Sequence, residues 1–375
     1  MRVLLAGGGT AGHINPAIAI AQSIRQHCAD AQILFVGNEG GLEQRLVPGA
    51  GFDIKTVSIR GFQRSLRPRA IVRNVGTVFK AVSASSAAKK IIREFSPDIC
   101  VGTGGYVSGP VIQAAQKLGI PTVIHEQNAY PGVTTKMLSK KAKRVMLAMD
   151  AARSRMDSGC NFVLTGNPVR PQIILADKEK ARQTLGLDSR PMVLSFGGSM
   201  GARKINESVA SVIARSGKDG RYQHIHAYGQ YGKWFPDLLR EKGADPDKCS
   251  NLDIREYIDN MDVCLAAADV VVCRCGAITL SEIQIMGKPS VLIPSPNVAE
   301  NHQYHNAMAL VERKAASVIE EKDLTDEKLT AEIDRLLSDE ALLAEYAAGA
   351  KSMAIDDANE RIFAVITEVL AEEKK

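Results

Sequence analysis

One pattern, repeated in both halves of this chain, constrains the fold more than any other feature. A short apolar strand runs into a glycine-rich loop and then into an amphipathic helix. These three segments are predicted at residues 3–6, 7–12 and 16–26, and again at 192–196, 197–201 and 205–213. A further strand at 33–36 completes a β-α-β unit, which implies a parallel sheet covered by helices. The sequence therefore predicts two α/β domains.

Other segments extend both halves. Strands are predicted at 99–101 and 122–124 with a helix at 110–118, and at 270–272 and 290–293 with a helix at 279–286. The segment from Thr165 to Pro171 contains two prolines and a glycine, which favours a linker. We expect a first domain over 1–168, a second over 169–351, and a C-terminal amphipathic helix at about 352–375 that packs back on the first domain.

Length and composition also favour two ordinary globular domains. The chain has 375 residues, 45% of them hydrophobic and 24% charged, with a formal net charge of +5. This composition excludes disordered, collagen-like and disulfide-dense chains, and the mild charge does not indicate a nucleic-acid partner. Seven scattered cysteines are expected to be thiols, and no apolar run approaches the ~18 residues that span a bilayer. We therefore expect a cytoplasmic protein whose contact with a membrane is peripheral.

The first glycine loop has two interpretations. Gly7, Gly9 and Gly12 follow the dinucleotide-binding string G-x-G-x-x-G between a strand and a helix. Such a loop can point main-chain N–H groups at a phosphate, but a tight turn needs the same glycines. A NAD-dependent oxidoreductase would also need an acid at the end of the second strand, where only Glu39 is available and lies late.

The second glycine loop matches the nucleophile-elbow string G-x-S-x-G, with Ser199 as the serine. A serine hydrolase would need an acid and a histidine downstream, for which Asp269, His302 and His305 are candidates. This loop opens a second domain, whereas the elbow normally follows a strand deep in one large sheet. We therefore favour Ser199 as a hydroxyl donor to a phosphate.

Two further motifs resemble metal sites but have simpler explanations. Asp245-Pro246-Asp247 spells D-x-D, yet its proline favours a surface turn. Cys273 and Cys275 have no second pair at zinc spacing, so buried thiols at a strand end are expected. We predict no metal site.

Several loop motifs, taken in order, resemble a known family. They are GGGTAGH from Gly7, GTGGYVSGP from Gly102, HEQN from His125, GNPVR from Gly166, GGSMGAR from Gly197, CRCGA from Cys273 with SE at Ser281, and QY-NA from Gln303. Each motif alone is unspecific, but the set covers nearly the whole chain. The sequence resembles glycosyltransferase family 28, in the branch that adds N-acetylglucosamine to undecaprenyl-pyrophosphoryl-N-acetylmuramyl-pentapeptide (lipid I), which completes lipid II for peptidoglycan.

The resemblance implies a GT-B fold, with two Rossmann-like domains facing each other across a cleft, and an inverting transferase that needs neither a cofactor nor a metal. The residues that it implies in binding UDP-N-acetylglucosamine are Thr10, Ala11, Gly12, Asn128, Arg170, Ser199, Ile258, Ala277, Ile278, Thr279, Leu280, Ser281, Glu282 and Gln303. Among these, Asn128 and Gln303 would read the hydroxyls of the sugar.

The implied nucleotide site lies in the second domain. Ser199 and Arg170 would contact the diphosphate, together with the start of the helix at 277–282. Ile258 would lie against the uracil, and Glu282 would accept hydrogen bonds from the ribose hydroxyls.

The first domain is expected to hold the acceptor. Its pyrophosphate would lie at Gly104, Gly105 and Tyr106. A base must take the proton of the muramyl 4-hydroxyl as it attacks the anomeric carbon, and His13 is the favoured base because imidazole titrates near neutral pH. Glu126 and His125 are the alternatives. A role for His13 in orienting the loop or the diphosphate is the competing interpretation.

Three positions depart from the family pattern. Ala11 stands where the family usually has glycine, which adds a methyl group beside the acceptor phosphates. Cys275 replaces a usual serine, and His302 replaces a frequent glutamine that contacts the sugar.

Basic residues gather in two segments of the first half. Residues 60–96 carry nine bases and one acid around an apolar stripe at helical spacing, formed by Ile71, Val75, Val78, Phe79 and Val82. The second cluster is Lys136, Lys140, Lys141, Lys143 and Arg144. An anionic bilayer surface suits this pattern, although a core-facing stripe beside solvated arginines would produce the same pattern. The lipid-borne acceptor favours peripheral attachment to the cytoplasmic face of the cell membrane.

The partners implied are therefore UDP-N-acetylglucosamine, lipid I, an anionic membrane surface, and cell-wall and division proteins, without nucleic acid. A UDP-sugar epimerase or a glycolipid synthase would share the donor loops. A sugar-nucleotide sensor without activity would keep the same loops but would not need His13, His125 and Glu126.

Overall fold

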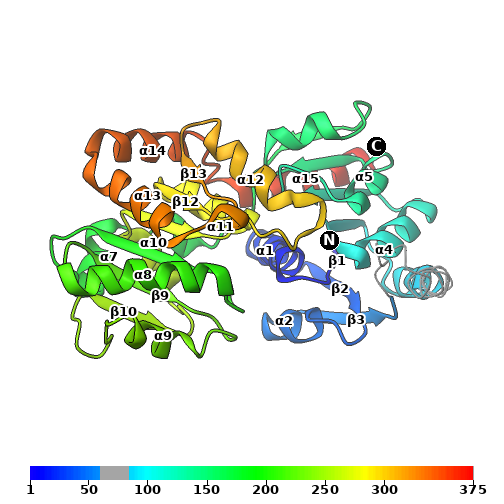
Figure 1. Ribbon diagram of the computed structural model, residues 1–375. Helices are drawn as coiled ribbons and strands as arrows, with labels where there is room; N and C mark the ends of the chain where they lie inside the picture. Colours follow the sequence, from blue (N-terminus) through cyan, green and yellow to red (C-terminus); the bar gives the residue numbers. More distant parts are fainter. Residues whose placement is uncertain (60–83, 375) are drawn as a thin grey trace. The chain divides into compact units, whose positions relative to one another are not determined.

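The computed structural model of the chain describes residues 1–59 and 84–374 (Figure 1). The chain divides into two compact units. The first comprises the residues up to Val169 together with those from Asp357 onward, and the second is Arg170–Asp356. The C-terminal helix thus belongs to the first unit, although the whole second unit separates it in sequence from the rest.

A seven-stranded parallel sheet forms the centre of the first unit, in the order β3-β2-β1-β4-β5-β6-β7 (Figure 1). Its strands are β1 (Arg2–Gly7), β2 (Gln32–Asn38), β3 (Asp53–Val57), β4 (Ile99–Gly104), β5 (Thr122–Glu126), β6 (Arg144–Leu147) and β7 (Phe162–Leu164). Its helices are α1 (Ala11–His27), α2 (Glu43–Gly49), α4 (Gly105–Lys117), α5 (Val133–Ser139), the short η1 (Asp150–Arg155) and α15 (Ala358–Glu372), and residues 84–95 are also helical. This is the strand order of a doubly wound Rossmann sheet, whose direction of growth reverses between β1 and β4.

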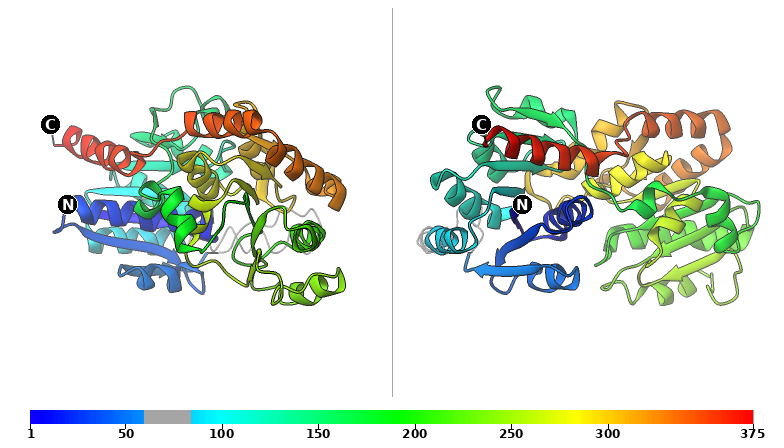
Figure 2. Two further views of the ribbon diagram at one scale, coloured as in Figure 1. Left: turned by 90° about the vertical axis from the view of Figure 1, so that its left-hand side faces the viewer. Right: turned by 180° about the vertical axis from the view of Figure 1, so that it is seen from behind.

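Alternate residues of β1 supply the core on the two faces of this sheet. Val3 and Leu5 are fully buried with α1 and α15, whereas Leu4 and Ala6 are buried with α4 and the helix at 84–95. Figure 2 shows α15 (red) beside α1 (blue), with which it is in contact. The apolar residues that α15 adds to this core are Ile362, Val365, Ile366 and Val369.

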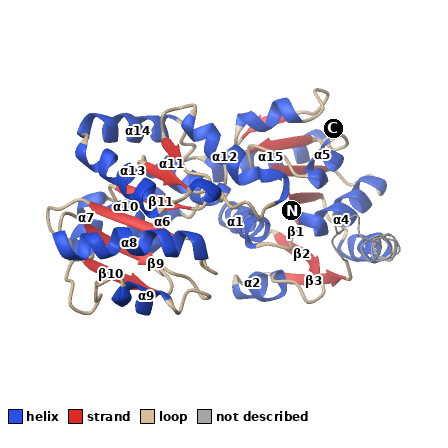
Figure 3. Ribbon diagram, in the orientation of Figure 1, coloured by secondary structure: helices blue, strands red, loops and turns tan. Residues whose placement is uncertain are grey.

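The second unit repeats the plan with a six-stranded parallel sheet of order β10-β9-β8-β11-β12-β13. Its strands are β8 (Met192–Phe196), β9 (Gln223–Ala227), β10 (Leu252–Arg255), β11 (Val270–Cys273), β12 (Ser290–Leu292) and β13 (Ala316–Val318). Its helices are α6 (Pro171–Ile174), α7 (Lys178–Thr184), α8 (Arg203–Asp219), α9 (Phe235–Glu241), α10 (Met261–Ala267), α11 (Ala277–Met286), η2 (Ala299–Asn301), α12 (His302–Val311), η3 (Glu321–Asp323), α13 (Asp326–Ser338) and α14 (Glu340–Ser352). In Figure 3 the strands of each unit lie between helices. The prediction of two parallel α/β domains is confirmed.

Two helices and one strand extend beyond their predicted limits. α1 begins at Ala11 and α4 at Gly105, so Pro16 and Pro110 lie inside helices rather than near their first residues. β4 continues to Gly104 because Gly102 packs against the sheet's covering layer, where a Cβ would lie 2.9 Å from the side chain of Ile112. Glycine at 102 is therefore a packing requirement and not the end of the strand. As a result, the glycine loops end earlier than predicted, and His13 lies in a helical turn.

Candidate active site

The turns after β1 and β4 meet where the strand order of the first unit reverses, which is where open parallel sheets bind ligands. Gly7 is paired with Gly104 at this point. A Cβ at Gly105 would collide with the carbonyl oxygen of Gly8, and Gly104 and Gly105 have φ angles of 98° and 77°. These positions require glycine both for the close approach and for the left-handed backbone. Packing thus brings two predicted motifs together.

His13 lies in the first turn of α1, at the same edge of the sheet. Its Nδ1 is 3.1 Å from the carbonyl oxygen of Thr103 and 3.2 Å from Oε1 of Gln127. Both partners only accept hydrogen bonds, so Nδ1 carries the proton and donates it. Among the described residues none is hydrogen-bonded to Nε2 of His13. The lone pair on Nε2 is therefore available to accept a proton.

The other two candidate bases, His125 and Glu126, are buried at the end of β5. Both ring nitrogens of His125 are hydrogen-bonded, one to a main-chain carbonyl at 2.9 Å and the other to the Gln127 amide at 3.0 Å. Burial lowers the pKa of His125, which keeps the ring neutral. Glu126 accepts hydrogen bonds from the main-chain nitrogens of Asn128 at 3.1 Å and Gly132 at 3.2 Å. Both groups hold the loop after β5, and the geometry favours His13 as the base.

A buried acid that the sequence analysis did not single out, Glu43, lies beneath the β1–α1 loop. Its carboxylate accepts hydrogen bonds from the main-chain nitrogens of Asn38 at 2.8 Å and Gly9 at 3.4 Å. A Cβ at Gly8 would lie 2.5 Å from it. An acid in this position repels phosphate, and the N–H of Gly9 is already used. The geometry therefore does not support the NAD-binding interpretation of the first glycine loop.

The predicted contacts for the acceptor pyrophosphate lie at the start of α4. Gly105 and Tyr106 are its first residues, and their N–H groups precede the first helical hydrogen bonds. The N–H of Gly104 instead donates to Oγ of Ser108 at 3.1 Å. Burial, and next the charge of Glu43, raise the pKa of Tyr106, so its hydroxyl stays protonated. Exposed residues at the start of α1 complete this edge: Thr10, Ala11 and Gly12.

In the second unit the strand order reverses between β8 and β11, and Ser199 lies in the turn after β8. Its neighbours Gly198 and Gly201 have φ angles of 93° and 84°. The N–H of Gln230 donates to the carbonyl of Ser199 at 3.1 Å, and a Cβ at Gly201 would collide with the carbonyl of Tyr228. The turn is thus held against the loop after β9, and Ser199 is exposed at its tip.

Two of the residues that a serine hydrolase would need beside Ser199 are bound to other groups. Asp269 is bound by Lys178 at 2.6 Å and by Arg182 at 3.2 Å, which ties α7 to the start of β11. His302 uses Nδ1 in a bond to a main-chain carbonyl of its own turn at 2.8 Å. Asp269 and Nδ1 of His302 are therefore engaged with partners other than Ser199. The geometry therefore favours Ser199 as a hydroxyl donor.

Glu282 faces Arg170 across the predicted nucleotide site. The guanidinium lies 3.6 Å from the carboxylate, which is only 8% exposed. Burial raises the pKa of Glu282, and Arg170 opposes this shift. Glu282 belongs to α11, whose first residues are the predicted segment 277–282. Ile258 is 2% exposed, so its side chain is buried.

Gln303 connects two loops of the second unit. Its Oε1 accepts hydrogen bonds from the main-chain nitrogens of Cys275 at 3.3 Å and Ser295 at 2.9 Å. The amide nitrogen points away from these bonds and is the part of Gln303 that can donate to a sugar hydroxyl. Cys275 is fully buried in the same loop, so this departure from the family pattern places a thiol in the core.

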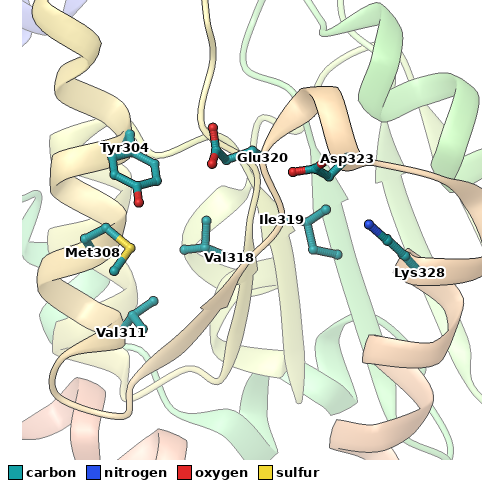
Figure 4. Close-up of a pocket in the computed structure, with 8 residues that line it drawn as sticks. All are labelled: Tyr304, Met308, Val311, Val318, Ile319, Glu320, Asp323 and Lys328. Carbon is teal, nitrogen blue, oxygen red and sulfur yellow. The ribbon is translucent and has the colours of Figure 1, made fainter.

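The second unit also contains a pocket of about 410 Å³ between α12, β13 and α13 (Figure 4). Its lining residues are Tyr304, Met308, Val311, Val318, Ile319, Glu320, Asp323 and Lys328. Figure 4 shows apolar side chains of α12 and β13 facing the same space as two carboxylates. None of the predicted donor-binding residues lines this pocket.

The two motifs that resembled metal sites have the predicted structural roles. Asp245-Pro246-Asp247 forms a turn, and Arg240 pairs with both aspartates at 3.6 and 3.2 Å. Cys273, at the end of β11, is fully buried as a free thiol, and burial raises its pKa.

Most of the first basic segment, residues 60–83 with the predicted apolar stripe, lies outside the described part of the chain. In the second segment, Lys140 pairs with Asp157 at 3.6 Å, Lys143 with Glu373 at 2.5 Å, and Arg144 with Glu372. The pairs with Glu372 and Glu373 join the cluster to the C-terminal end of α15, and all three pairs reduce its net charge. Beside it, α5 exposes Val133 and Met137, at 64% and 50%. None of the helices described combines the length and apolar character that crossing a bilayer requires.

The fold and its loops define the class of this protein. Two parallel sheets of the same doubly wound order, each with a glycine turn at its reversal point, form a GT-B-type glycosyltransferase. The chain belongs to glycosyltransferase family 28. Residues 3–147 match the family 28 N-terminal domain and residues 192–362 match the family 28 C-terminal domain.

Full-length relatives within this family share one named activity. The chain is 44% identical over 371 residues to the UDP-N-acetylglucosamine–N-acetylmuramyl-(pentapeptide) pyrophosphoryl-undecaprenol N-acetylglucosamine transferase of Acetivibrio thermocellus, covering 99% of this chain and 98% of the relative. It is 41% identical over 373 residues to the enzyme of that name from Bacillus cytotoxicus, covering 99% and 100%. The crystal structure of Acinetobacter baumannii MurG superposes with a TM-score of 0.77 at 28% identity, over 98% of this chain and 99% of that one.

Proposed function

We propose that this chain transfers N-acetylglucosamine from UDP-N-acetylglucosamine to the 4-hydroxyl of the muramyl sugar of lipid I, which produces lipid II and UDP. The observation that carries the proposal is the state of His13: Nδ1 is held by two oxygen acceptors, and Nε2 is open at the reversal point of the first sheet. The named activity of the full-length relatives supplies the substrates.

In the proposed reaction the acceptor oxygen attacks the anomeric carbon of the donor sugar from the face opposite UDP. A C–O bond forms to the acceptor as the C–O bond to UDP breaks, and the bonding electrons leave with the diphosphate. Nε2 of His13 takes the proton of the acceptor hydroxyl. The configuration of the sugar is inverted, and the role needs a nitrogen that is unprotonated and without a protein partner, as found on His13.

The donor would bind at the β8–β11 reversal point of the second unit. Ser199 and the N–H groups of its turn are placed to meet the diphosphate, and Arg170 adds a positive charge that would balance the leaving group. Glu282, an acceptor-only group when ionised, would take the ribose hydroxyls, and the main chain of Ile258 would meet the uracil edge. The sugar of the donor would be held by two amide side chains. Gln303 would donate the N–H of its side-chain amide to a sugar hydroxyl. Asn128 would also bind a sugar hydroxyl.

The acceptor would bind along the first unit, with its pyrophosphate at the start of α4. Gly105 and Tyr106 offer main-chain N–H groups there, Tyr106 adds its hydroxyl, and the 13-residue helix adds its positive end. Gly104 would line the site without donating, because its N–H is bonded to Ser108. Glu43 would keep the anionic group away from the Gly8–Gly9 side of the loop.

A direct test of the function measures UDP release from UDP-N-acetylglucosamine with and without a lipid I analogue. We expect release to depend on the acceptor and the product to carry a β-1,4-linked N-acetylglucosamine. A sugar-nucleotide sensor would release no UDP under either condition. Equal release without acceptor, or an epimer of the donor as the product, would rule out the transferase.

We also propose that the first unit attaches peripherally to the cytoplasmic face of an anionic membrane. Val133 and Met137 of α5 present an exposed apolar pair, and Lys136 and Lys141 flank it as bases for which no ion pair is present in the described residues. Each such charge contributes ~1 kcal/mol near an anionic surface.

Vesicle sedimentation tests the attachment. Vesicles with anionic lipid should retain the protein, and the double substitution Lys136→Glu and Lys141→Glu should weaken binding by about tenfold or more. The substitution Lys180→Glu is the control, at an exposed lysine of the second unit for which no ion pair is present in the described residues, and it should have no effect. Equal retention on neutral vesicles would contradict the proposal.

A further inference from the structure

We propose that Gln127 is a positioning residue that fixes the tautomer and the ring orientation of His13. The inference rests on the proposed function, because it explains how His13 is kept ready to act as a base. It concerns a side chain that the sequence analysis passed over as the third letter of the HEQN motif.

The orientation of the Gln127 side-chain amide is determined by its surroundings. Its Nε2 lies 3.0 Å from the main-chain carbonyl oxygen of His125, a group that can only accept a hydrogen bond. The amide nitrogen must therefore be on that side, and the oxygen must face His13. The main chain of Gln127 is held as well, since its carbonyl accepts a bond from the amide of Asn167 at 3.3 Å.

The tautomer of His125, which lies further into the core, is fixed in the same way. The second hydrogen of the Gln127 amide points at Nδ1 of His125, 3.0 Å away, so this nitrogen is the acceptor. The proton of His125 is then on Nε2, which donates to the carbonyl of Gly166 at 2.9 Å. His125 is fully buried and burial lowers its pKa, so it stays neutral and keeps Nδ1 as an acceptor, despite the charge of its neighbour Glu126.

Three hydrogen bonds in series thus run from the carbonyl of Gly166 through His125 and Gln127 to His13. Each member has one allowed arrangement of donors and acceptors. At the end of the series, Nδ1–H of His13 lies between the oxygens of Gln127 and Thr103, so its Nε2 must be the unprotonated nitrogen.

A neutral amide has a particular consequence in this position. A carboxylate would stabilise the imidazolium that forms when His13 takes the proton, and would also hold that proton before reaction. An amide oxygen orients the ring without adding a charge. Gln127 is 2% exposed, so no water can replace its oxygen without rearrangement of the loop after β5.

The test compares two substitutions of Gln127 in the full-length enzyme. Gln127→Leu removes the acceptor and should lower kcat about 10- to 100-fold, with the KM for UDP-N-acetylglucosamine within about twofold of wild type. Gln127→Glu keeps an acceptor but adds a charge, so the acidic limb of the kcat/KM profile should move upward by about one pH unit. Gln116→Leu is the matched control, because Gln116 also bonds a hydroxyl and a main-chain carbonyl in the first unit, at 3.2 and 3.0 Å.

The tautomer itself is read by imidazole 15N resonances of the free enzyme labelled at histidine. Wild type should show His13 protonated on Nδ1, and Gln127→Leu should show a mixture of both tautomers. The inference would be overturned if Gln127→Glu did not move the acidic limb of the kcat/KM profile. It would also be overturned if His13 stayed entirely in the Nδ1–H form in Gln127→Leu. Because this measurement needs no turnover, it is separate from the proposed function, which would fail instead if UDP release did not depend on the acceptor.

Discussion

Replacement of His13 by alanine is expected to lower kcat for sugar transfer by about 10²–10⁴-fold, the contribution of a positioned general base. The substitution removes Nε2, the nitrogen that the described residues leave open, while the glycine turns that hold the loop remain. Binding of the donor should change little. The measurement is UDP release at saturating UDP-N-acetylglucosamine and lipid I analogue.

Ser199→Ala provides the contrasting variant. It removes a hydroxyl proposed to bond the diphosphate, so the KM for the donor should rise about tenfold, with a smaller change in kcat. Wild-type turnover by the His13 variant would mean that another group takes the proton. A complete loss of turnover in the Ser199 variant with unchanged donor affinity would instead revive the hydrolase interpretation.

Acidification from pH 7 to pH 5 is expected to reduce the free energy of unfolding by roughly 2 kcal/mol through the buried His226. The buried His224 should lower it further in the same direction. Both contact Oγ of Ser195, at 2.7 and 2.8 Å, and the remaining ring nitrogen of each has no partner among the described residues. Burial lowers the pKa of His226 to about 3, and lowers that of His224 well below its usual 6.5.

The direction of this change in stability follows from proton binding. Between about pH 6.5 and pH 3 the unfolded chain binds protons on these histidines that the folded chain does not, so stability falls as the pH falls. His226→Phe removes one titrating ring beside Phe235, whose ring centre lies 4.4 Å away. It should therefore reduce the loss between pH 7 and pH 5 by about 2 kcal/mol.

Urea unfolding at the two pH values measures this difference. His27→Gln is the control, because it replaces an exposed histidine of the first unit and leaves both buried rings in place. An identical loss in wild type and His226→Phe would show that the buried rings do not control the acid sensitivity.

The site was only partly predictable from sequence. His13, Ser199 and Glu282 lie in or beside glycine turns, and such turns follow strands whose apolar pattern is readable. Gln127 and Glu43 give no such local signal. Their roles depend on partners that are distant in the chain. Gln127 is bonded to His13, 114 positions away, and Glu43 is bonded to Gly9, 34 positions away.

Some expectations changed for reasons of packing and charge. The lysine and arginine cluster at 136–144 looked uniformly basic, but three of its members pair with acids, one on α15 and one directly after it. The side chain of Ile258, expected against the uracil, is buried in this structure. Neither fact could be read locally, because both depend on which distant segment covers the residue.

The sequence by itself determined the two parallel α/β domains, since a strand, a glycine turn and a helix are encoded by short-range patterns of apolar residues and backbone freedom. Only the tertiary structure decided which candidate base is open. His125 and Glu126 have the right chemistry, yet the fold buries both and occupies their polar atoms. His13 is held by one nitrogen, and no described residue is bonded to the other. That difference arises from hydrogen bonds between segments far apart in the chain.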